Sequence, residues 1–552
     1  MRAAKEIGWL QPLASRATGD TTYAATLSMR DGEPEFAVTS SLQGLGLTLP
    51  APLAKPADTA LPLRIERKVV LRETRTAGAA SRVNDELLFS LGDVASATYL
   101  RDVSAAQPRV LRGAIGVGVP QGEAPSLPNS GVHANLQLGQ FDIAAWQALL
   151  GEAEAGGATA DPAPKTAKAG TSTGTGTGTG STSDYLPTQI AVRAQALGIG
   201  GGRTLHDVVM GGSRDGAVWR ANVDASELSG YAEYNPSQAG RIYARLARLR
   251  IAPSEAGSVE SLLDEQPGAL PALDIVVDEF ELLGKHLGRA EIVAVNRGGA
   301  RREWRLDKLA FTMPEASFTA QGSWAVGLNG NGPKDPRSTA MSFRLDMADA
   351  GALLARFGMK DVIRHGRGRL EGDVDWRGSP LSLDYPTLGG QLHVDVGTGQ
   401  FLKADPGLAK LLGVLSLQAL PRRLTLDFRD LFSEGFAFDF VRGDVKIVDG
   451  RASTNNLQMK GVNAAVLMDG VADIAKETQN LRAVVVPQIN AGTAALVATA
   501  INPAIGLGTF LAQWLLSKPL SAAGTQEFQI DGTWTDPNIT KVPRKTGKDA
   551  SS

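Results

Sequence analysis

Apolar residues alternate with polar ones along the last third of the chain. Between Phe401 and Pro537, short runs such as FAFDF, GDVKIV and AAVLMDG follow one another, interrupted by a short helical segment and by an apolar, proline-broken one. Successive side chains of a strand point to opposite faces of a sheet. The alternation therefore predicts a sheet with one continuous apolar face, and nothing in the pattern is typical of a reaction centre.

Composition narrows the class of protein. The 552 residues include 63 glycines, and the formal net charge is −2. A net charge this close to zero gives no bulk electrostatic attraction to nucleic acid or to an anionic membrane, so we expect no nucleic-acid partner. The absence of cysteine excludes disulfides, thiolate metal sites and a cysteine nucleophile.

The amino-terminal sequence MRAAKEIGWLQPLASRATG has basic residues but no apolar stretch after them, so it predicts neither a signal peptide nor a membrane anchor. The long uncharged run, residues 491–517, is broken by Asn502-Pro503 and by Gly506 and Gly508. We interpret residues 491–519 as a buried or interface-lying helical cap rather than a membrane span. Its candidate membrane-proximal residues are Ile501, Ile505, Phe510, Leu511, Trp514 and Leu515.

Composition also divides the chain. Residues 1–155 read as a β segment ending in a short helix, and 185–400 read as its continuation. Between them, 156–184 is rich in Gly, Thr and Ser, which predicts a disordered insertion. Residues 401–540 form the carboxy-terminal β region, and 541–552 are expected to be a disordered tail.

Three segments have the signature of a strand that leads directly into a short capped helix. Each begins with an aspartate suited to capping the first turn and has a glycine suited to closing the last one. The pairs are Asp142 and Gly151, Asp349 and Gly358, and Asp405 and Gly413.

Motifs for catalysis are missing. The five histidines are scattered singly, and neither HExxH nor G-x-S-x-G occurs. Gly198 to Gly202 resembles a phosphate-binding turn but lacks the Lys-Ser/Thr that would follow it. Asp373 and Asp375 share a strand face, which solvent-facing alternation explains. We therefore expect no enzyme, no catalytic residue, no metal and no cofactor.

The predicted apolar face must be shielded from water. Each large apolar side chain left in water costs roughly 1.5–3 kcal/mol, so a dozen would exceed the usual net stability of about 5–15 kcal/mol. A second layer of protein or an apolar ligand must cover them, and the pattern alone leaves both open. The candidate lining residues are Met341, Phe343, Leu345, Leu424, Leu426, Phe428, Phe436, Phe438, Phe440, Val445, Ile447, Leu457, Met459, Val466 and Met468.

A family resemblance bears on this choice. The run LPRRLTLDFRDLFSEGFAFD, the later VVVPQINAGTAALVATAINPAIGLGTFLAQ and the closing EFQIDGTW resemble the carboxy-terminal region of the bacterial AsmA-like, bridge-like lipid-transfer proteins. The resemblance implies a long, curved, largely antiparallel β-groove, an open sheet with a few short capping helices. It also implies that phospholipid acyl chains move along the apolar interior between the inner and outer membranes.

On this reading the partners are phospholipids, the two membranes and other envelope proteins, and the location is the periplasm. The resemblance implies an inner-membrane anchor at the amino-terminus, which this sequence lacks, so we expect it to be a fragment. Arg241, Arg245, Arg248 and Arg250 are candidates for contact with lipid phosphates, although a solvated strand edge also explains them. Two alternatives stay open: a structural or assembly protein of the envelope with a closed β core, and an enzyme acting on glycan or lipid.

Overall fold

The computed structural model describes residues 16–30, 32–73, 82–105, 107–120, 126–156, 182–200, 203–237, 239–252, 270–297, 303–326, 337–380, 383–402, 436–461, 464–487, 504, 506–517 and 525–543. The fold is mainly β: a mostly antiparallel sheet that is open rather than closed, with three short α-helices among the described residues. This confirms the expected fold class. The chain divides into two compact units, one comprising residues 1–238 and 242–250 and the other the remainder.

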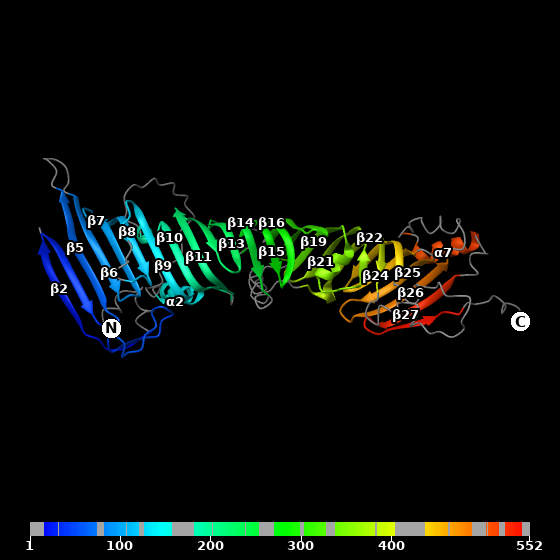
Figure 1. Cartoon of the computed structure of the whole chain (residues 1–552), viewed down its shortest axis with the longest axis horizontal. Coiled ribbons are helices and arrows are strands. Elements are labelled where there is room, and N and C mark those ends of the chain that lie inside the picture. Colours follow the sequence, from blue (N-terminus) through cyan, green and yellow to red (C-terminus); the bar gives the residue numbers. More distant parts are fainter. Residues whose placement is uncertain are drawn as a thin grey trace, which may run out of the picture. The chain divides into compact units, whose positions relative to one another are not determined.

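In the first unit, β1 and β4 form a separate two-stranded sheet. The other strands from β2 to β13 follow their order in the sequence across the main sheet (Figure 1). The strands of the first unit are β1 (Ala17–Gly19), β2 (Tyr23–Arg30), β3 (Glu33–Ser40), β4 (Leu45–Leu47), β5 (Leu63–Glu73), β6 (Arg82–Leu91), β7 (Ala95–Asp102), β8 (Arg109–Val117), β9 (Gly131–Asp142), β10 (Gln189–Gly200), β11 (Arg203–Asp215), β12 (Val218–Asp224), β13 (Leu228–Asn235) and β14 (Arg241–Ile251).

Strand β9 pairs in parallel with both β8 and β10, unlike the antiparallel pairs around it. Parallel neighbours need a long crossover, and α2 (Ile143–Gly156) and the 3-10 turn η4 (Thr182–Tyr185) lie on the connection to β10. As predicted, Asp142 caps α2, because its Oδ1 accepts from the amides of Ala144 and Ala145 at 2.9 and 3.1 Å. The expectation that the helix closes at Gly151 is wrong. Residues 152–155, EAEA, favour helix and carry it to Gly156.

The second unit is antiparallel throughout its described pairs. Asp349 caps α4 (Ala350–Arg356), and Gly358 follows with a φ of 96°, as predicted. The third predicted strand-to-helix segment, with Asp405 and Gly413, lies outside the described residues. The other elements are β15 (Ala272–Leu282), β16 (Lys285–Arg297), β17 (Glu303–Thr312), β18 (Ala316–Val326), β19 (Arg337–Met347), β20 (Ile363–His365), β21 (Gly368–Arg377), η8 (Tyr385–Thr387), β22 (Gly389–Phe401), β23 (Phe436–Val448), β24 (Arg451–Gly461), β25 (Ala464–Asp473), β26 (Thr478–Pro487), α7 (Gly506–Ser517), β27 (Gln526–Thr533) and β28 (Pro537–Lys541).

A β-bulge in β23 changes which residues share a face. The register to β24 shifts between Phe438 and Phe440. Phe438 is 1% exposed in an apolar cluster that Val441 also joins. Phe440 instead lies under the guanidinium of Arg442, 4.1 Å from the ring centroid. The extra residue of a bulge reverses the alternation, so Phe440 leaves the apolar face to which its parity had assigned it.

Strands β25 and β26 are apolar on both faces. Val466 and Val485 pack in the cluster around Phe438, whereas Leu467, Val484 and Val486 point the other way. Helix α7 covers the second set: Leu507 is 1% exposed against them, and Phe510 packs beside it (Figure 1). The part of the predicted helical cap that the structure describes therefore covers the opposite face from the candidate lining.

The bulge yields a matched pair of substitutions. Phe438→Ala should lower the free energy of unfolding by about 3–5 kcal/mol, because it leaves a cavity in a packed cluster. Phe440→Ala should cost distinctly less, since its side chain is only partly buried. Chemical denaturation of both variants measures the difference, and equal losses would contradict the assigned faces.

Candidate functional site

Apart from Phe440, the predicted lining residues of the second unit whose side chains are described come together on one face of its sheet. Met341 and Val445 pack around buried Trp376 and Ile447, and Met459, Val466 and Met468 belong to the cluster of Phe438. Phe343 and Leu345 continue the same face along β19, and Leu457 pairs directly with Met468. We call this surface the apolar face of the second unit.

Four phenylalanines form a stack on the apolar face: the candidate Phe343 and three that the sequence reasoning missed. Phe280, Phe311, Phe318 and Phe343 come from β15, β17, β18 and β19, and their successive ring centroids lie 5.7, 5.9 and 6.1 Å apart. The stack crosses several strands of the sheet, each of which contributes one ring. Only the register of pairing reveals it, which no local pattern encodes.

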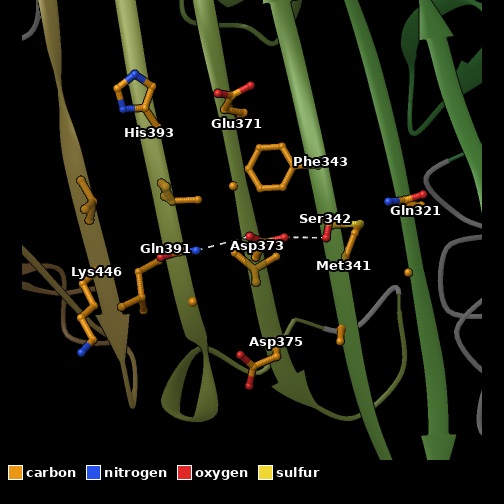
Figure 2. A pocket seen from close by; sticks show the side chains of 18 of the residues that line it. Gln321, Met341, Ser342, Phe343, Glu371, Asp373, Asp375, Gln391, His393 and Lys446 are labelled. Atoms are coloured by element: carbon orange, nitrogen blue, oxygen red, sulfur yellow. Dashed lines mark hydrogen bonds between the residues drawn. The ribbon is translucent and has the colours of Figure 1, made fainter.

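An open hollow of about 1790 Å³ follows β17–β19 and β21–β24. Its lining includes the predicted Met341, Phe343, Val445 and Ile447, together with polar neighbours on the same strands. Figure 2 shows Phe343 and Met341 on β19, and Ser342 between them joined to Asp373. The hollow is large enough for hydrocarbon chains, and it is open to solvent.

The alternate residues form a hydrogen-bonded polar face. Asp373 accepts from Ser342 Oγ at 2.5 Å and from Gln391 Nε2 at 3.4 Å, a row visible in Figure 2. Asp444 likewise contacts His393 Nδ1 at 2.8 Å and accepts from Asn456 Nδ2 at 2.7 Å. Burial alone would raise the pKa of Asp444, but its hydrogen bonds to His393 and Asn456 lower it overall. These carboxylates are held in pairing networks typical of a solvated sheet face.

Asp346 is the most strongly shifted acid on this face. It accepts from Arg344 Nε and Arg369 Nε, both at 2.8 Å. The hydrogen bonds from these guanidiniums lower the pKa of Asp346 to about 2. Ion pairing with Arg344 on the same strand and with Arg369 on the neighbouring strand explains the shift without a catalytic role.

Neither metal sites nor membrane-spanning helices occur in the described part of the chain. No group of three or more His, Asp or Glu residues is arranged to hold a metal ion there. None of the helices described has the length and apolar content needed to cross a bilayer.

Several predicted positions receive no test. Leu424, Leu426, Phe428, Ile501 and Ile505 lie outside the described residues, and the side chains of Phe436, Leu511, Trp514 and Leu515 are likewise not described. Of the candidate phosphate-binding arginines on β14, Arg245 lies 4.1 Å from the Tyr243 ring centroid. Arg248 donates to the carbonyl of Ala225 at 2.8 Å.

Comparison with known proteins decides the family. The family model described as "YhdP protein" matches residues 5–539. The chain belongs to the YhdP family. It is 29% identical over 522 residues to the "Intermembrane phospholipid transporter YhdP" of Escherichia coli (strain K12), a match that covers 92% of this chain and 37% of that relative. No solved structure matches the chain.

The pairing of Asp346 predicts a pH dependence in this YhdP-family chain. Because its folded pKa of about 2 lies below the ordinary 3.8, its contribution to stability is fully present above pH 3.8 and is lost as the pH falls through 2. Asp346→Asn should destabilise modestly at pH 6, by less than about 1 kcal/mol because solvent screens the pairs. Denaturation midpoints of the two proteins should converge near pH 2; a constant difference from pH 6 to pH 2 would refute the assignment.

Proposed function

We propose that this chain is a segment of a lipid-transfer bridge in the cell envelope. The apolar face shields phospholipid acyl chains from water while the headgroups stay solvated. The polar face, with its paired carboxylates, remains in the aqueous periplasm. Transport then runs between inner and outer membranes and maintains the outer-membrane barrier.

The observation that carries the proposal is the incompletely covered apolar face. Met341, Phe343 and Leu345 on β19 are only partly buried, although they alternate with polar residues of a solvated face. Leaving large apolar side chains in water is unfavourable. We therefore infer that an apolar ligand covers these side chains of β19. The name of the Escherichia coli relative, an intermembrane phospholipid transporter, supports the same choice.

On this proposal the protein is not an enzyme. Acyl chains replace water along the apolar face, no bond is made or broken, and direction comes from elsewhere in the envelope. Because the chain spans 37% of the length of its relative, attachment to the inner membrane and contact with the outer membrane or other envelope proteins belong to the proposal for the whole assembly.

A second candidate is a structural envelope protein with a closed core. The region around β25 and β26 favours it locally, because both faces are covered and Val466 and Val485 are fully buried. Phospholipid that co-purifies with the gently extracted protein would argue for transfer, and its absence in native mass spectrometry would favour the structural role.

Photo-crosslinking at neighbouring positions of β19 tests the proposal directly. A photoreactive residue at Phe343 should label phospholipid several-fold more than one at Arg344, because consecutive strand positions point to opposite faces. The two probes share the same strand and local fold, so each controls for the other. Equal labelling at both positions, or none at either, would reject the apolar face as the lipid path.

A further inference from the structure

A charged cluster interrupts the apolar face of the first unit. Leu87 pairs with Tyr99, and Phe89 pairs with Ile65, so these residues share one face of β5, β6 and β7. Two residues before Leu87 on β6, Asp85 occupies the same face, and its side chain is 0% exposed. Alternation there predicts an apolar residue, yet the position holds a carboxylate.

Two arginines hold this carboxylate. Arg101 donates from Nε to Asp85 Oδ1 at 2.9 Å and from Nη2 to Oδ2 at 2.7 Å, and Arg67 Nε donates to Oδ2 at 2.5 Å. Arg101 Nη1 also donates to the hydroxyl of Tyr185 at 3.2 Å. The Tyr99 hydroxyl donates to the Tyr185 carbonyl at 3.1 Å, which fixes η4 against β7.

Both arginine side chains of the cluster keep a small exposed part. Asp85 is fully covered, whereas the side chains of Arg67 and Arg101 keep 16% and 12% exposure. Each guanidinium has five N–H donors, and the hydrogen bonds to Asp85, Tyr185 and Pro34 use only some of them. The two arginines and Asp85 together carry a net charge of +1, and Glu33 adds one negative charge beside Arg67. We expect a ligand on this face to meet the remaining oriented N–H donors.

Glu33 is the nearest further acid. Its carboxylate lies 3.8 Å from Arg67 Nη2, too far for a hydrogen bond, and its side chain is 34% exposed. Glu33 thus competes for Arg67 without occupying its donors.

Stability does not explain the cluster. Replacing buried ion pairs by apolar residues is often neutral or stabilising, because desolvation offsets the attraction. Ionisable residues within the hydrocarbon of a bilayer are by default candidates for a functional role, and a sheet face covered by acyl chains would be a comparable environment. Paired, pre-oriented guanidiniums are suited to phosphate, whose oxygens accept several charge-assisted hydrogen bonds.

We propose that Arg67 and Arg101, oriented by Asp85, bind the phosphate of a phospholipid headgroup whose acyl chains lie on Ile65, Leu87 and Phe89. We call this binding site the headgroup station. It rests on the proposed lipid-transfer function and adds a headgroup contact to it. Asp85 and Tyr185 are positioning residues, and the arginines touch the ligand.

The test compares a phospholipid with a lipid that lacks phosphate. The full chain is loaded from vesicles that contain phosphatidylglycerol and diacylglycerol with identical acyl chains, and the bound lipids are quantified by native mass spectrometry. Arg67→Gln leaves Asp85 paired with Arg101, so the fold should persist. It should reduce the preference for phosphatidylglycerol about tenfold, the value of one charge-assisted hydrogen bond.

Three further variants sharpen the result. Arg67→Lys should restore part of the preference, and Glu33→Gln should increase it by releasing Arg67. Arg482→Gln, which removes a comparable pair with Asp469 in the second unit, should leave the preference unchanged. An unchanged ratio in Arg67→Gln, or an equal change in Arg482→Gln, overturns the headgroup station.

Two readouts separate the possible failures. Labelling from a probe at Phe343 reports acyl-chain binding independently, so its persistence with an unchanged lipid ratio rejects only the headgroup station. Inorganic phosphate is added as a competitor in a second arm. If it binds in an Arg67-dependent manner while the wild-type chain shows no preference between the two lipids, the cluster is a site for free anions and the proposal fails.

Discussion

The constraint on which this structure depends is that its sheet is open and mostly one layer thick. A sheet has two faces, and alternation makes one of them apolar in both units. At β25 and β26 the chain covers both faces itself, with the cluster of Phe438 on one and α7 on the other. Along β19 the same kind of face stays partly exposed. On the proposed function, this difference separates the plain core from the surface that lipid would cover.

The alternation of the sequence was sufficient to predict a mainly β chain with an apolar face, because period two is a property of the backbone. That the sheet is open rather than closed followed only from the family resemblance. Alternation was insufficient where the backbone departs from that period. The bulge after Phe438 reverses the faces without any local signal, which is why Phe440 was assigned to the lining. Asp142 and Asp349 were predictable as helix caps, since capping depends only on residues within one turn.

Features that depend on register lay beyond sequence reasoning. The stack from Phe280 to Phe343 joins four strands, and the Asp85 cluster joins three. Their members are unremarkable along the chain, where an arginine or aspartate in a strand reads as a solvated residue. Likewise, the uncharged run around α7 indicates a buried helix but not which face of the sheet it covers.

On the proposed function, the aromatic stack and the Asp85 cluster would select lipids by different properties. A stack of aromatic rings contacts any hydrocarbon chain through dispersion, so it favours lipids as a class without distinguishing among headgroups. Oriented guanidiniums do the reverse, since they respond to charge and geometry and gain little from hydrocarbon. If lipids contact both surfaces, the aromatic stack packs against their acyl chains in place of water. The charged cluster then determines which headgroups are bound. Specificity on such a face then requires only a few ionised residues set into a lining that is otherwise apolar.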